Sequence, residues 1–293
     1  MKTTMYELLI EFEDRLKQKG LATTTIYNKT RNLKAFLNHC NETALTTTGQ
    51  EIEEYLRECF NEDHSTALYN HRIRDLKQFY GLLLDRELLL LNPLDGIERK
   101  ETERPSRSVF TQEEVKRIID AIPDTPRGRR DRAIIELVYS TGLRIGELMG
   151  LDLEDVDVGT REIIVRHGKG GRERIVPVGR EALVVLERYL EDRLADTFQR
   201  EHESLFLNCF GRRPGRHGLE WMFEQKKRAA GVKTKGNIHA LRHSFASHLS
   251  AHGAPLELIR RMLGHRSLDS THEYTHITKQ TLRKVFKASH PKA

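Results

Sequence analysis

The sequence has few cysteines and no long apolar run. Its three cysteines among 293 residues form no CxxC pair, which argues against a disulfide framework and a cysteine-rich zinc site. The longest apolar stretches, residues 82–84 and 88–91, are far shorter than the roughly 20 residues that cross a bilayer. No apolar signal segment follows the N-terminal Met-Lys-Thr-Thr. We therefore expect a cytoplasmic protein with no membrane partner.

Two common enzyme motifs are also missing. The phosphate-binding pattern GxxxxGK[ST] does not occur, so nucleotide hydrolysis has no support. Two histidine pairs, His239/His243 and His248/His252, have the i,i+4 spacing of a helical metal site. However, no HExxH motif occurs and no carboxylate falls between residues 237 and 256. The metal alternative therefore has little support.

Basic charge is concentrated toward the C-terminus. Residues 1–100 carry 14 Lys and Arg against 16 Asp and Glu, whereas residues 212–293 carry 17 against 5. Such a concentration is typical of a protein that binds a polyanion, and nucleic acid is the partner it favours. The alternative is a solvated basic face without a partner.

The chain is long enough for two domains. Apolar periodicity and glycine stops predict four helices within residues 1–97, the second of them capped by Thr23 or Thr24. Residues 98–108 contain no apolar side chain and are predicted to be a linker. Residues 109–293 are predicted to form a second domain. It begins with a capping box from Thr111 to Glu114 and consists of helices around short strands between residues 155 and 178.

Four segments carry residues that packing alone does not explain. In the first, Gly142 and Gly146 flank Arg144 where a helix should continue, which indicates a close backbone approach. The alternative is a helix end with a surface arginine. In the second, Lys169 lies on a glycine-rich hairpin tip, from which it can reach a DNA groove or a phosphate, or simply be solvated.

The other two segments lie near the C-terminus. His239 and Arg242 are three residues apart at the start of a predicted helix, so they share a face and offer neighbouring donors to a phosphate. His265 follows Leu-Gly, and Tyr274 follows nine residues later between polar neighbours. Polar neighbours favour a tyrosine side chain that is accessible at the surface over one that is packed in the core.

In this order, the four segments resemble the tyrosine recombinase family of phage-integrase type, and within it the Xer-like subgroup. The matching features are Thr-Gly-Leu-Arg144 with Glu147, Gly-Lys169-Gly, the His239-x-x-Arg242 box, the Leu-Gly-His265 box and Tyr274. The resemblance implies a mainly α fold. It would have an N-terminal four-helix core-binding (SAM-like) bundle and an α+β catalytic domain with a small antiparallel β-sheet.

The resemblance also implies a reaction, in which DNA is cleaved and rejoined through a 3′-phosphotyrosine. It assigns Tyr274 as nucleophile, Glu147 as a supporting residue, and Arg144, Lys169, His239, Arg242 and His265 as further catalytic residues. No metal and no cofactor are expected. The partners implied are a double-stranded recombination site and further subunits in a homotetramer, or a heterotetramer with a second recombinase. The biological task would be chromosome dimer resolution or the integration and excision of a mobile element.

Two other functions remain open on the same fold. One is a non-catalytic DNA-binding protein, and the other is an enzyme similar to type IB topoisomerases that relaxes supercoils. A C-terminal helix predicted over residues 278–288 bears on the assembly of a recombinase. Leu282, Val285 and Phe286 form an apolar stripe on it, which is expected to pack on a partner subunit or, alternatively, on its own domain.

Overall fold

The computed structural model describes residues 4–41, 44–59, 66–101, 108–166, 173–195, 203–264 and 279–292, without the side chains of residues 279–282. The chain divides into two units, Met1–Pro105 and Ser106–Ala293, which are taken separately below. The predicted linker, residues 98–108, lies largely outside the described residues, and its limits stay a prediction. None of the described helices is both long and apolar enough to span a bilayer.

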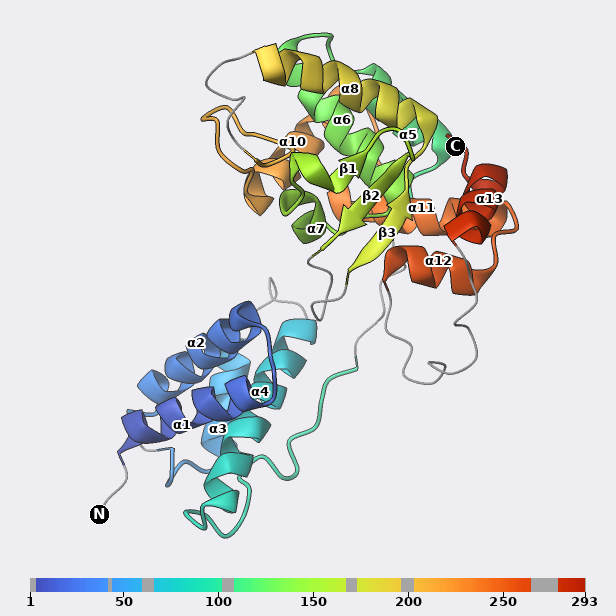
Figure 1. Cartoon of the computed structure of the whole chain (residues 1–293). Helices are drawn as coiled ribbons and strands as arrows, with labels where there is room; N and C mark the ends of the chain where they lie inside the picture. The colour runs from blue at the N-terminus through green and yellow to red at the C-terminus, as the bar shows by residue number, and fades with distance from the viewer. Residues whose placement is uncertain are drawn as a thin grey trace. The chain divides into compact units, whose positions relative to one another are not determined.

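The described residues of unit 1 form four helices (Figure 1): α1 (Met5–Gln18), α2 (Thr23–His39), α3 (Gly49–Glu58) and α4 (Thr66–Asp85). Capping boxes at Thr4 and Thr48 start α1 and α3. The predicted threonine cap of α2 is wrong. Ala22 is the N-cap and no side chain bonds there, because both threonines already lie inside the helix. The core is rich in aromatic rings, such as Phe12 edge-on to Phe79.

Unit 2 combines helices with a small sheet. Its elements are α5 (Gln112–Asp120), α6 (Pro126–Thr141), α7 (Ile145–Met149), the 3-10 turn η1 (Leu153–Asp155), β1 (Val156–Asp157), β2 (Glu162–Val165), β3 (Arg174–Pro177), α8 (Arg180–Ala195), α10 (Arg216–Ala229), α11 (Ile238–Ala251), α12 (Leu256–Leu263) and α13 (Lys279–Ser289). The strands run antiparallel in the order β1-β2-β3. The predicted fold class, mainly α with a small antiparallel sheet in the second unit, is confirmed.

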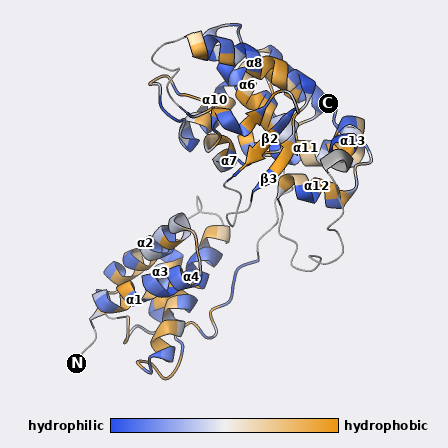
Figure 2. Cartoon of the chain, viewed as in Figure 1, coloured by the Kyte–Doolittle hydropathy of each residue, from blue (hydrophilic) through white to orange (hydrophobic). Residues whose placement is uncertain are grey.

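Helix α6 is the centre of unit 2. Thr125 is its N-cap and Pro126 its first residue, and all of its last nine residues are buried. It packs against α8 and α11. Figure 2 shows strands β2 and β3 coloured as hydrophobic, and their buried side chains belong to the same core as those of α6. The predicted capping box of Thr111 and Glu114 starts α5. Because α6 is buried over its last nine residues and packs against α5, α8, α10 and α11, the residues just after it occupy a fixed place.

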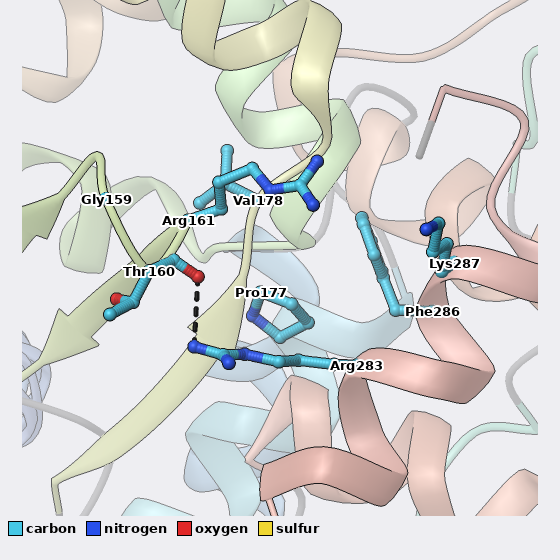
Figure 3. A pocket seen from close by; sticks show the side chains of 8 residues that line it. All are labelled: Gly159, Thr160, Arg161, Pro177, Val178, Arg283, Phe286 and Lys287. Atoms are coloured by element: carbon cyan, nitrogen blue, oxygen red, sulfur yellow. Dashed lines mark hydrogen bonds between the residues drawn. The ribbon is translucent and has the colours of Figure 1, made fainter.

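Helix α13 packs on its own unit. Phe286 is buried and stacks on His290 at 4.8 Å between ring centres, and it belongs to a small core with Phe245 of α11. Arg283 donates a hydrogen bond to the carbonyl oxygen of Thr160 (3.0 Å) across a pocket of about 280 Å³ (Figure 3). In this single chain, Phe286 and the partly buried Val285 of the predicted apolar stripe therefore pack on their own unit, which was the alternative expectation.

Candidate active site

The turn after α6 positions Arg144. Gly142 ends α6 in the left-handed region (φ 64°). A Cβ atom there would lie 2.5 Å from the ring of Phe245 and 2.7 Å from the side chain of Leu263, so only glycine fits. The predicted close approach is confirmed at Gly142. It is wrong at Gly146, where a Cβ would meet nothing within 4 Å.

Arg144 is the N-cap of the short helix α7, which the sequence analysis did not predict. Its backbone N–H donates to Glu147 Oε2 (2.8 Å), and its guanidinium donates to Glu147 Oε1 (2.7 Å) and to the carbonyl oxygen of Gly264 (3.1 Å). The side chain is 25% exposed. Arg144 is thus fixed at one edge by protein groups and open to solvent at another.

Arg242 comes to the same place from α11, 98 residues further along the chain. It is 3% exposed and donates to the carbonyl oxygens of Gly142 (2.5 Å) and Leu263 (2.6 Å). One of its nitrogens lies 3.9 Å from Glu147 Oε2. Burial, together with the charge of Arg144, lowers the pKa of Arg242 to about 9, so the group remains cationic at neutral pH.

Arg174 is a third arginine in this cluster, and sequence reasoning missed it. It begins β3, where it donates to both carboxylate oxygens of Glu147 (2.9 and 2.8 Å) and to the carbonyl oxygen of Met262 (2.9 Å). Unlike Arg144 and Arg242, it stands in none of the motifs named above and at no predicted helix start. The only local signal is a basic residue at the end of the hairpin that carries Lys169.

Glu147 holds the arginines together. Its side chain is 4% exposed and touches guanidinium groups from α7, β3 and α11. Burial by itself raises the pKa of Glu147. Hydrogen bonds from Arg174 and Arg144 outweigh that effect and bring the pKa to about 2. The carboxylate is therefore ionised throughout the physiological range.

His239 lies in the first turn of α11, where the side chain of Asn237 accepts a hydrogen bond from its backbone N–H (3.0 Å). Its ring is edge-on to His243, with 5.1 Å between ring centres. Partial desolvation, followed by the charges of His243, Arg242 and Arg144, lowers the pKa of His239 below its ordinary value. The ring is exposed and, being neutral at pH 7, can both accept and donate a proton.

Lys169, His265 and Tyr274 lie outside the described residues. Two of them adjoin the cluster along the chain. His265 directly follows Gly264, whose carbonyl oxygen binds Arg144. Lys169 belongs to the hairpin between β2 and Arg174. Within the described ranges, no group of three or more His, Cys, Asp or Glu side chains gathers as a metal site would require.

Comparison with known proteins gives consistent matches along the chain. The profile of the Phage integrase family matches residues 108–281, and that of the Phage integrase N-terminal SAM-like domain matches residues 8–89. The tyrosine recombinase XerC of Myxococcus xanthus is 36% identical over 302 residues, which cover 99% of this chain and 100% of that one.

Two solved structures are also similar. The crystal structure of XerA recombinase is 28% identical, with a TM-score of 0.51 and coverage of 99% of this chain and 100% of that one. A lambda integrase tetramer bound to a Holliday junction is 20% identical, with a TM-score of 0.71 and coverage of 94% and 81%. At that identity the second likeness concerns the fold alone.

Proposed function

The chain belongs to the phage integrase family as a tyrosine recombinase of the Xer type, and from this premise we propose that it cleaves and rejoins double-stranded DNA at a specific site through Tyr274. The observation that carries the proposal is the meeting of Arg144 and Arg242 at Glu147 and at the end of α12. Two guanidinium groups 98 residues apart in sequence are thereby held for one phosphate.

In the proposed first step, the hydroxyl oxygen of Tyr274 attacks phosphorus and the bond to the 5′-oxygen breaks. A 3′-phosphotyrosine forms, and the leaving 5′-oxygen takes a proton, which we assign to Lys169. In the second step, the 5′-hydroxyl of another strand attacks the phosphotyrosine and tyrosine leaves. The number of phosphodiester bonds is conserved, so no nucleotide is consumed.

Arg144 and Arg242 would bind the non-bridging oxygens, where negative charge increases in the transition state. A metal clamp takes this part in many other phosphoryl-transfer enzymes. A tyrosine hydroxyl with an ordinary pKa of about 10 is a weak nucleophile at neutral pH, and nearby cations favour its ionised form. His239 and His265 would donate further hydrogen bonds or accept the tyrosine proton. Glu147 supports Arg144 without touching substrate.

The test is a covalent adduct. Host DNA is incubated with the protein, and adducts are trapped, purified and sequenced to identify the site. Tyr274→Phe should abolish the adduct while site affinity stays within about twofold, because affinity rests mainly on basic contacts to phosphates. Tyr139→Phe is the matched control. Tyr139 is buried and its hydroxyl is bonded to His248 Nδ1 (2.8 Å), so this variant should still form the adduct.

Three results would overturn the proposal. An adduct that persists in the Tyr274→Phe variant would place the nucleophile elsewhere. A wild-type chain that binds DNA and never forms an adduct would be a non-catalytic binding protein. Relaxation of supercoils by a monomer without strand exchange would favour the activity of a type IB topoisomerase.

We further propose that the active assembly on DNA is a tetramer, made of this chain alone or shared with a second recombinase, in the cytoplasm. The similar lambda integrase structure is a tetramer on a Holliday junction. Exchange between two duplexes requires four strand cleavages, hence four tyrosines. Sedimentation of the protein on its site DNA tests the stoichiometry, and complexes that never exceed two subunits would contradict it.

A further inference from the structure

Arg174 occupies a junction of three segments of unit 2. It lies at the first position of β3, paired with Val165 of β2. Its guanidinium reaches Glu147 on α7 through two parallel hydrogen bonds, and its Nε reaches the carbonyl oxygen of Met262 in the last turn of α12. Paired hydrogen bonds of this kind fix orientation as well as distance. The side chain is 13% exposed, so water competes little for these contacts.

The packing of Gly264 is a second, independent sign that this side chain is held in place. Gly264 ends α12 in the left-handed region (φ 62°). A Cβ atom on it would lie 3.2 Å from each of three Arg174 atoms, Cδ, Cζ and Nε. The backbone of Gly264 therefore lies directly on the guanidinium. The same glycine accepts a hydrogen bond from Arg144 through its carbonyl oxygen.

These contacts distinguish the roles of the three arginines. Arg174 directs three side-chain hydrogen bonds at groups of its own unit, two of them at the carboxylate that also binds Arg144. Arg144 is about twice as exposed as Arg174, at 25% against 13%. Arg144 is therefore better placed than Arg174 to meet a phosphate, whereas the hydrogen bonds of Arg174 all go to groups of its own unit.

We propose that Arg174 is a positioning residue for strand cleavage, which holds Glu147 so that Arg144 is aligned and ties the start of β3 to the end of α12. The inference rests on the proposed function above. Arg174 touches no reacting atom. It acts because a catalytic group displaced by about 1 Å loses about 100-fold in rate, and both neighbours of Arg174 lead directly to predicted catalytic residues.

The experiment uses the full-length protein and the site recovered by adduct sequencing, with a nick that prevents religation. Single-turnover cleavage is measured at saturating protein from acidic to neutral pH. Arg174→Met should lower the rate constant about 10- to 100-fold, with site affinity within about twofold. Arg174→Lys keeps the charge and loses the paired geometry, so it should recover only part of the rate.

A matched control lies on the other side of the hairpin. Arg166 follows β2 and binds Asp155 (2.6 Å) and Glu154 (3.1 Å), away from the cluster. Arg166→Met should leave the cleavage rate at saturating protein within about threefold of wild type. It should not change the pH profile, because the carboxylates that Arg166 binds are those of Asp155 and Glu154, and not that of Glu147.

The pH profile separates positioning from mere stability. Arg144, Arg174 and Arg242 are the charged groups that face Glu147 among the described residues. Without Arg174 the pKa of Glu147 rises, so the acidic fall in cleavage should move to higher pH than in wild type. If Arg174→Met only lowered the fraction of folded protein, the cleavage rate would fall by the same factor at every pH after correction for the folded fraction. The acidic fall in rate would then stay at the pH of the wild type.

A double variant shows whether Arg174 acts through Glu147, and it also removes both buried charges together. In the E147Q background, adding Arg174→Met should lower the cleavage rate constant by less than about threefold relative to E147Q alone. An equal cost in both backgrounds, or an Arg174→Met rate and pH profile like those of wild type, overturns the inference and leaves the proposed function intact. If wild type itself forms no adduct, both proposals fall.

Discussion

Replacing Glu147 by glutamine tests how strongly the arginine cluster depends on one carboxylate. Glutamine has nearly the shape of the glutamate side chain and lacks the negative charge of the carboxylate. The pKa of Glu147 lies at about 2 in the fold, against 4.5 ordinarily. At 1.36 kcal/mol per pKa unit this difference corresponds to about 3 kcal/mol. The side chain is 4% exposed, so solvent screening removes little of it.

The sign of the pH dependence follows from the lowered pKa. The stabilisation by ionised Glu147 is fully present above pH 4.5 and is lost as pH falls through 2. Glu147→Gln should therefore lower the free energy of unfolding by about 3 kcal/mol at pH 7, and by about half of that at pH 3. Between pH 7 and pH 5.5 the difference between variant and wild type should be constant.

The assay is urea denaturation followed by tryptophan fluorescence. Trp221, the only tryptophan of the chain, lies in α10 and reports on unit 2. Glu154→Gln is the control, because Glu154 is 72% exposed and pairs with Arg166 at the surface. It should change the free energy of unfolding by less than about 0.5 kcal/mol. A Glu147→Gln effect below about 1 kcal/mol at pH 7, or one equal at pH 7 and pH 3, would refute the reasoning.

Three further outcomes are expected. Gly142→Ala should destabilise unit 2 by at least about 2 kcal/mol in urea, because its Cβ would overlap Phe245 at a positive φ; an unchanged midpoint contradicts this. Burial lowers the pKa of His290 to about 4, so stability should fall by about 3 kcal/mol from pH 7 to pH 4, and His290→Asn should flatten that fall. Residues 106–293 alone should fold and bind site DNA more weakly than the full chain; equal affinity in a gel-shift titration would refute a contribution from unit 1.

Local signals in the sequence were sufficient for most of the helices. Apolar side chains at helical spacing predicted α1, and the box of Thr111 and Glu114 predicted the start of α5, because both depend on contacts within one turn. Helix α7 was missed since five residues are too few to show a period. The cap of α2 was misassigned because threonine is a favourable N-cap residue, whereas Thr23 and Thr24 are already helical and Ala22 is the N-cap.

The candidate site was predictable only in part. Arg144, Glu147 and Arg242 stand out through their motifs, and the structure brings them together. Arg174 did not stand out, because its partners Glu147 and Met262 are 27 and 88 residues away. The roles of Lys169, His265 and Tyr274 stay predictions, since these residues lie outside the described part of the chain.

The charge of the cluster explains why the site needs a ligand of opposite sign. Three guanidinium groups meet one carboxylate and the carbonyl ends of two helices, α6 at Gly142 and α12 at Met262, Leu263 and Gly264. Each helix end carries about half a negative charge, so the cluster keeps about one positive charge. Left-handed glycines end both helices and expose those carbonyl oxygens. A phosphodiester supplies one negative charge in the ground state and more in the transition state, so the surplus binds the transition state more strongly than the substrate.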